Sequence, residues 1–296
     1  DPLEFSSLRP PAQTAPRECA LADGAARLAQ LTDDAWSLRT GDRVLAEGKR
    51  TCGAVDYAAA DGSGITVAVT DFWQRYPKAL AASGDRLDIQ LLPAIPDSDT
   101  YAGLPWQLGF PFVGGKYRFK WGMSTTDRVN VTFRPPGSTA DVAAAAADVR
   151  PAIAVVASEY YETTGALGAI VAKVPGEFEE WDSLYAETFA RHMARKEVQR
   201  EYGYLNWGDW FGERGRNWGN NEYDLPHSLF LQFARTGNRD YFRLALAGAR
   251  HQADVDCVHG YPDPYVIGAN HAHSVCHTGE GSEMLRQPKW TRRYDK

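Results

Sequence analysis

The sequence predicts a multidomain α and β protein in which an antiparallel β-sandwich is followed by a partial α/α toroid. Two observations support this fold class. Residues 36–138 contain short segments of alternating polar and apolar residues, separated by turns rich in Gly and Pro. Residues 178–296 instead carry apolar residues at helical spacing. This change of period predicts two structurally different parts.

Composition limits the classes of function that the chain can have. The 296 residues suffice for two domains, and 44% hydrophobic with 24% charged residues is typical of a folded protein. Lys and Arg number 32 against 38 Asp and Glu, so no basic excess points to a nucleic acid. No apolar run approaches the roughly 18–20 residues of a membrane helix, so no membrane partner is expected.

The first segment, residues 1–35, mixes prolines, among them Pro10, Pro11 and Pro16, with a short Ala-rich stretch. We expect it to be an entry segment or the end of a preceding β domain. Residues 1–5 have neither a basic cluster nor an apolar core, so no signal peptide is expected in this chain.

The four cysteines form no C-x-x-C pair, which argues against a zinc knuckle. Their even number permits two disulfides, of which Cys257–Cys276 is the favoured bridge. Buried free thiols are an equally acceptable interpretation.

The predicted sandwich, residues 36–138, rests on several strand-like segments. Such short strands without long helices between them are typical of antiparallel sandwiches. The clearest are Ile65–Thr70, Arg86–Leu92, Lys116–Trp121 and Val129–Phe133.

Residues 139–177 are predicted as a linker helix, at Ala140–Ala147, and a connection. A low-complexity linker is the alternative interpretation of that Ala-rich stretch. The region 178–296 then begins with an amphipathic helix that ends near Gly203. Its apolar stripe consists of Trp181, Leu184, Tyr185, Phe189, His192 and Met193.

A second helix is expected at residues 226–235, followed by a turn at Thr236–Asn238, where Asn238 can cap a third helix. Two helices joined by such a turn form an antiparallel hairpin, and successive hairpins build α/α toroids. A toroid of six hairpins needs roughly 300 residues. Because only residues 151–296 remain for it, we expect a partial toroid and favour a fragment of a longer protein.

Residues 200–224 contain seven aromatic residues, five Gly and four Asn, a mixture that suits no regular element. Aromatic faces cover the apolar face of a sugar, while Asn, Asp and Arg bind its hydroxyls or carboxylate. We therefore predict that this segment lines a carbohydrate-binding cleft. A structural loop pinned by aromatic anchors and ion pairs is the competing interpretation. The predicted substrate-binding residues are Tyr204, Asn206, Trp207, Trp210, Arg216, Trp218, Asn220 and Asn221.

A second cluster places His271, His273 and His277 within seven positions. The pattern allows three interpretations: a metal site, a proton-transfer site, or a loop whose histidines only form hydrogen bonds. No motif fixes the spacing, so a metal is not predicted here.

Several of these segments together resemble the exo-rhamnogalacturonan lyase family, that is, polysaccharide lyase family 26 and its relatives. The resemblance rests on Tyr202–Arg214, Asn217–Asp224, Asp71–Lys78, Tyr117–Met123 and His271–His273. It implies a large protein with an N-terminal β domain, a central β-sandwich and a C-terminal α/α toroid. It also implies a secreted or periplasmic location and an acidic polysaccharide or oligosaccharide as partner.

The reaction implied by this resemblance is β-elimination next to a uronic acid. The carboxylate would be neutralised by Arg214, Arg216 or the pair Asn220 and Asn221. His271 or His273 would remove the C5 proton, and Tyr223 or Tyr204 would protonate the leaving oxygen. No redox cofactor is implied, and the participation of calcium is left open.

Two other classes remain open at this stage. An inverting glycoside hydrolase needs two carboxyl groups about 6.5–9.5 Å apart, which Glu213 with Glu222 or Asp224 could supply. A carbohydrate-binding fragment without catalysis is the other class.

Overall fold

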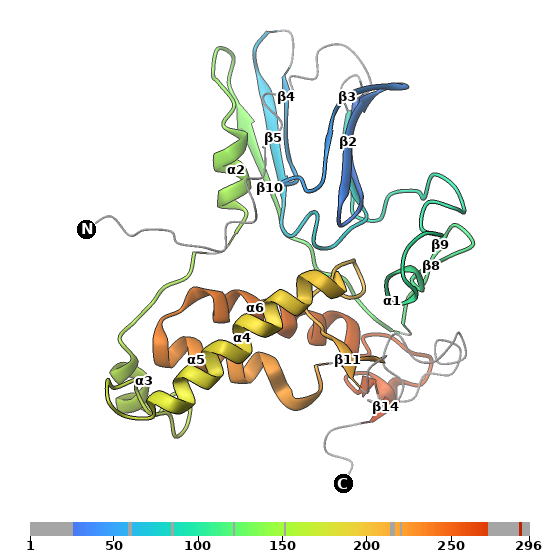
Figure 1. Cartoon of the computed structure of the whole chain (residues 1–296). Helices are drawn as coiled ribbons and strands as arrows, with labels where there is room; N and C mark the ends of the chain where they lie inside the picture. Colours follow the sequence, from blue (N-terminus) through green and yellow to red (C-terminus); the bar gives the residue numbers. More distant parts are fainter. Residues whose placement is uncertain are drawn as a thin grey trace. The chain divides into compact units, whose positions relative to one another are not determined.

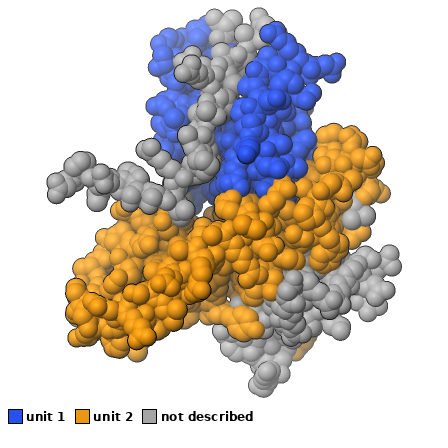
Figure 2. Space-filling view, in the orientation of Figure 1, with its two compact units in different colours: residues 1–94, 127–152 blue, residues 95–126, 153–296 orange. Residues whose placement is uncertain are grey.

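The computed structural model describes residues 26–58, 61–83, 86–120, 122–150, 152–213, 217–219, 221–271 and 290–291. The chain divides into two compact units, shown in different colours in Figure 2. The first, here called the β unit, comprises residues 1–94 and 127–152. The second, the helical unit, comprises residues 95–126 and 153–296.

The β unit contains two antiparallel sheets (Figure 1). The five-stranded sheet has the order β3-β2-β1-β6-β7, and the three-stranded sheet has the order β10-β5-β4. The strands are β1 (Ala26–Thr32), β2 (Ala35–Thr40), β3 (Arg43–Gly48), β4 (Ala54–Ala58), β5 (Gly64–Val69), β6 (Lys78–Ser83), β7 (Arg86–Gln90) and β10 (Val129–Arg134).

Both sheets contribute to one apolar cluster, because alternate residues of their strands point inward. The cluster consists of Leu28, Trp36, Leu38, Val55, Val67, Val69, Phe72 and Leu80. Helix α2 (Val142–Asp148) packs on the three-stranded sheet. It contacts Ala54 of β4 and Ala68 of β5. This helix is the one predicted at Ala140–Ala147, but it packs on a sheet and is not a free linker.

The observed bounds of the β unit differ from the predicted range. Its first strand begins at Ala26, and residues 95–126 belong to the helical unit. Lys116–Trp121 alternates like a strand, yet only Lys116–Tyr117 forms one, β9, which pairs with β8 (Phe112–Val113). Tyr117 and Phe119 of this segment pack with Tyr204, which explains their alternation without a longer strand.

The segment Asp71–Lys78 has a structural role inside the β unit. Arg75 and Lys78 are buried and donate to the same carboxylate oxygen of Asp127, at 3.0 and 2.7 Å. Burial lowers the pKa of Lys78, and Asp127 opposes this shift. This cluster links β6 to Asp127, which lies just before β10. Removing one partner would leave a buried charge uncompensated, so the link is costly to break.

Three helices dominate the helical unit: α4 (Glu179–Gln199), α5 (Leu225–Thr236) and α6 (Arg239–His251) (Figure 1). The predicted hairpin between α5 and α6 is confirmed, with Asn238 accepting the backbone N–H of Asp240 as its cap. Gly237 takes the left-handed conformation (φ 70°) that ends α5.

The core of this unit forms between the three helices. Its fully buried members are Leu229, Phe233, Tyr241, Leu244 and Ala245. Tyr185, Phe189 and Met193 of the predicted α4 stripe pack against it, whereas Trp181 and Leu184 are exposed. Helix α4 ends at Gln199, before the predicted stop at Gly203, and its C-cap residue Arg200 takes a left-handed conformation (φ 56°).

Short elements complete the helical unit. They are α1 (Trp106–Gly109), α3 (Ser158–Thr164), β11 (Phe211–Glu213), β12 (Asn217–Trp218), the 3₁₀ turns η1 (Glu222–Asp224) and η3 (Pro264–Val266), the π-helical turn η2 (Gln252–Asp256), β13 (Asn270–His271) and β14 (Trp290–Thr291). Within the ranges described above, no helix combines the length and apolar character needed to cross a bilayer.

The cysteines follow the free-thiol interpretation where the structure describes them. Cys52 and Cys257 are free. The expected Cys257–Cys276 bridge is therefore not formed at Cys257, while Cys19 and Cys276 lie outside the described residues.

Candidate functional site

The segment between α4 and α5, residues 200–224, is called the ribbon below. Its centre is the β11–β12 hairpin, in which Phe211 pairs with Trp218. Two side chains hold this hairpin: Arg195 of α4 donates to the Phe211 carbonyl at 2.7 Å, and Glu201, near the start of the ribbon, accepts the Phe211 N–H at 2.9 Å. The ribbon is thus fastened to α4 by Arg195 and to its own first residues by Glu201.

Two residues predicted to bind substrate are instead core anchors. Tyr204 is buried, donates its hydroxyl to the Arg118 carbonyl and packs against Phe112 and Phe119. Burial raises the pKa of Tyr204 far above its ordinary value, which makes it a poor proton donor. The roles predicted for Tyr204 in sugar binding and protonation are therefore wrong.

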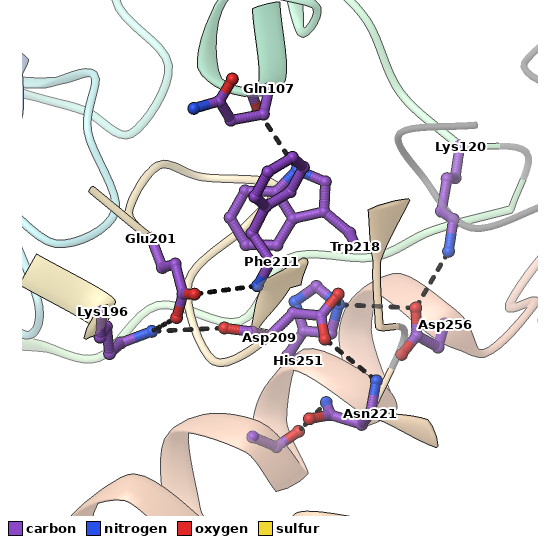
Figure 3. Close-up of polar contacts among 11 residues, drawn as sticks. Gln107, Lys120, Lys196, Glu201, Asp209, Phe211, Trp218, Asn221, His251 and Asp256 are labelled. Atoms are coloured by element: carbon purple, nitrogen blue, oxygen red, sulfur yellow. Dashed lines mark hydrogen bonds and ion pairs between the residues drawn. The ribbon is translucent and has the colours of Figure 1, made fainter. Parts of the chain in front are cut away.

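Trp218 is the other core anchor. Its side chain is 0% exposed, meets Phe211 edge to face and donates its indole N–H to the Gln107 carbonyl at 3.2 Å (Figure 3). A side chain without exposed surface cannot cover a sugar, so the prediction for Trp218 is also wrong. The aromatic-anchor interpretation holds for this part of the ribbon.

The two described asparagines of the predicted set are buried as well. Asn221 donates its side-chain amide to the Gly248 carbonyl at 3.0 Å, and its own N–H is bound by Asp209 at 3.0 Å. The Asn206 side-chain oxygen has no hydrogen-bond partner among the residues that the structure describes. Both amides point into the protein, which contradicts their predicted contact with sugar hydroxyls.

Trp207 is half-buried. Its ring stacks on Tyr202, with centroids 5.6 Å apart, and the Lys196 ammonium lies 5.0 Å from its ring centroid. These contacts hold Trp207 against α4 through stacking and a cation–π interaction.

Trp210 and Tyr223 are the predicted residues that the structure brings together at the surface. Their ring centroids lie 6.5 Å apart with planes 32° apart, and Tyr223 is 78% exposed. The half-buried indole of Trp210 lies directly over Gly219, where an added Cβ would meet it at 2.3 Å. Asp224 is also exposed and pairs with His227 at 3.2 Å.

Arg214, Arg216, Asn220 and His273 lie outside the described residues. For His271 the backbone is described, and it pairs with Trp290 between β13 and β14. The roles of these residues stay predictions.

Backbone strain is concentrated where Tyr223 is presented. Asn221, Tyr223 and Asp224 have φ values of 51°, 70° and 56°, in the left-handed region. Each such residue costs about 1–3 kcal/mol and persists only where its surroundings enforce it. Asn and Asp tolerate this region better than a bulky Tyr does, so the conformation of Tyr223 is the most unusual of the three.

A buried charged network supports the ribbon, and the sequence analysis missed it (Figure 3). The His251 imidazole nitrogen Nε2 lies 3.8 Å from a carboxylate oxygen of Asp209 and 3.5 Å from one of Asp256. Asp256 also pairs with Lys120 at 2.9 Å. His251 and Lys120 thus face the carboxylates of Asp209 and Asp256 inside the helical unit.

The local structure of α6 explains how these groups meet. His251 is the last residue of α6, where the helix dipole favours a cation. The π-helical turn η2 follows at once and directs Asp254 and Asp256 toward residues 120–126. Asp254 accepts the N–H and the hydroxyl of Thr126, both at 2.8 Å. Helical periodicity contains no signal for such a turn, because the turn departs from it.

Asp209 titrates abnormally in this network. Burial raises the pKa of Asp209, the nearby His251 opposes the shift, and Asp256 adds to it. Perturbed carboxyl groups of this kind occur at functional sites and in structural ion networks. Within the described part of the chain, no group of three or more His, Cys, Asp or Glu is arranged to hold a metal ion.

Comparison with known proteins gives the class of the helical unit. Residues 151–294 match the family model of the PcRGLX-like protein C-terminal alpha/alpha toroid domain. The part of the helical unit from residue 153 onward is thus similar to this alpha/alpha toroid domain.

One relative extends the similarity over most of the chain. The "Uncharacterized protein YetA" of Bacillus subtilis (strain 168) is 27% identical over 295 residues, covering 88% of this chain and 34% of the relative. The chain therefore spans about a third of the length of this curated relative.

Proposed function

We propose that this chain is part of a polysaccharide lyase that cleaves a uronic-acid-containing, rhamnogalacturonan-like polysaccharide by β-elimination. The similarity of residues 151–294 to a PcRGLX-like toroid domain supports the carbohydrate class. The proposal further assigns the protein the β-sandwich and toroid architecture of such lyases, with a secreted or periplasmic location.

The observation that carries the proposal is the Trp210–Tyr223 pair. An indole beside an exposed phenol offers an apolar face for a sugar ring and a hydroxyl that can donate a proton. The strained conformation of Tyr223 supports a functional role, because strain of this kind clusters at ligand and active sites.

In the proposed reaction, a base removes the C5 proton of the uronate while its electron pair forms the C4–C5 double bond. The bond from C4 to the glycosidic oxygen breaks, and Tyr223 donates its hydroxyl proton to that oxygen. His271 or His273 is the proposed base, and Arg214, Arg216 or Asn220 neutralises the carboxylate. Each proton transfer contributes about 10²–10⁴ in rate.

The test is a direct assay of the chain with rhamnogalacturonan and with ulvan, read as ultraviolet absorbance of the new C4–C5 double bond. Elimination produces this absorbance, whereas hydrolysis cannot. New reducing ends without this absorbance would indicate hydrolysis. The proposed function would then be that of an inverting hydrolase that uses Glu213 with Glu222 or Asp224. Binding without either product would indicate a non-catalytic carbohydrate-binding fragment, and the absence of both binding and products would refute the carbohydrate proposal. Repeating the assay with a calcium chelator tests the dependence on calcium.

A further inference from the structure

The buried Asp209 and the exposed Tyr223 are linked by a short chain of contacts. One Asp209 carboxylate oxygen accepts the N–H of Asn221 at 3.0 Å, and the other faces His251. Asn221 begins the left-handed stretch that contains Tyr223, and its carbonyl accepts the Asp224 N–H at 3.2 Å. The Asp209 carboxylate therefore binds the backbone of Asn221, at the start of the turn that sets the position of Tyr223.

The same stretch is held from α6. The Asn221 amide donates to the Gly248 carbonyl at 3.0 Å. Gly208, directly before Asp209, packs so closely on α6 that an added Cβ would lie 2.2 Å from the Ala247 carbonyl oxygen. The ribbon backbone next to Asp209 is thus packed directly against α6.

His251 lies against the Asp209 carboxylate, with its Nε2 at 3.8 Å from one oxygen. It lies between Asp209 and Asp256, and all three side chains are at most 3% exposed. Lys120 holds Asp256 from the other side, and Lys196 donates to the Asp209 carbonyl at 3.3 Å. Because Asp209 is buried, water cannot replace the hydrogen-bond and charge partners of its carboxylate unless the core opens.

We propose that Asp209, oriented by His251, is a positioning residue that holds the left-handed Asn221–Asp224 turn and thereby presents Tyr223 beside Trp210 for proton donation. The structural half of this proposal stands by itself, and its catalytic half rests on the proposed lyase function. Asp209 does not itself touch the substrate.

The first test needs no substrate. Hydrogen exchange of the Asn221–Asp224 amides is measured by mass spectrometry in the wild type, Asp209→Ala and Asp209→Asn. Loss of a hydrogen bond to a charged group should speed exchange about tenfold or more in Asp209→Ala, while the amide oxygen in Asp209→Asn restores most of the protection. Asp182→Ala is the matched control, since Asp182 is also buried and paired, with Arg235 at 2.7 Å, but lies on α4. Unchanged exchange in Asp209→Ala, or the same acceleration in Asp182→Ala, would overturn the positioning role.

The second test is a double-mutant cycle on lyase turnover. Asp209→Ala should lower kcat about tenfold or more when Tyr223 is present, and less than about twofold in Tyr223→Phe, whose residual turnover is followed over long incubations. Losses that multiply would show that Asp209 does not act through Tyr223. If the wild type neither binds nor cleaves the polysaccharide, the proposed function fails, whereas the exchange experiment still decides whether Asp209 holds the turn.

Discussion

The indole of Trp210 and the exposed phenol of Tyr223 lie side by side although 12 residues separate them, with ring centroids 6.5 Å apart. The hairpin between them brings the two together, and a buried carboxylate, Asp209, secures the turn that carries Tyr223. The Trp210–Tyr223 pair at the surface is therefore supported by a buried residue of the helical unit. Mutations can change the pair and its support separately.

Tyr223→Phe should lower turnover by about 10²–10⁴ while oligosaccharide affinity stays within about tenfold, because only the proton donor is lost. Steady-state kinetics and calorimetric titration measure the two quantities. Tyr265→Phe serves as the control, since that phenol is also exposed but lies in η3. Turnover at the wild-type level would remove Tyr223 from the mechanism.

Trp210→Ala should weaken oligosaccharide binding by about 1–3 kcal/mol, by analogy with the stacking of aromatic side chains on flat ligands. Calorimetric titration provides the value. Trp181→Ala, at an exposed indole of α4, should leave affinity unchanged. Equal affinities for the two variants would mean that Trp210 has no part in binding.

Tyr223→Gly should raise the free energy of unfolding by about 0.5–1 kcal/mol, because glycine adopts the φ of 70° without a Cβ clash. The same change should abolish proton donation, so stability and activity move in opposite directions. Urea denaturation measures the first effect. A destabilised variant would show that the phenol ring contributes more through its contacts than the backbone strain costs.

Lys120→Met should destabilise the protein by about 3–5 kcal/mol, since it leaves the buried Asp256 carboxylate without its ammonium partner. Arg243→Ala breaks an ion pair with Asp240 on the exposed face of α6 and should cost about 0–1 kcal/mol. Chemical denaturation of both variants compares the two environments. Similar losses would imply that the Lys120–Asp256 pair is open to water.

His192→Gln should flatten the pH dependence of stability below pH 6.5. Burial lowers the pKa of His192 below its usual value of 6.5, while Glu201 opposes this shift. The unfolded chain then binds a proton more readily than the folded protein, so His192 makes the unfolding free energy fall as the pH drops below 6.5. Denaturation curves across pH 5–7 should show a shallower slope for His192→Gln than for the wild type. A slope equal to that of the wild type would contradict the assignment.

The sequence carried strong signals for the helices of the helical unit. The spacing of Tyr185, Phe189 and Met193 predicted the buried face of α4, and Asn238 marked the start of α6. Such signals are local, because caps and periodicity act over one or two turns.

The candidate site was harder to predict, since a core anchor and a sugar platform use the same residue types. Tyr204 and Trp218 fit the cleft composition as well as Trp210 does, yet only packing against residues about a hundred positions earlier, such as Gln107 and Arg118, decides that they are buried. The network of Asp209, His251 and Lys120 likewise depends on distant segments and on one irregular turn.

The contact between Gly208 and α6 sets a limit on how this region can vary. Backbone there rests against backbone, and even one methyl group would lie 2.2 Å from the Ala247 carbonyl oxygen. Gly248 on the facing helix also has a close neighbour, Pro226, at 2.8 Å from an added Cβ. Any larger residue at either position forces the two segments apart, and none can draw them nearer. This spacing is a minimum, so any adjustment of the proposed sugar-binding surface must come from the Trp210 and Tyr223 side and not from α6.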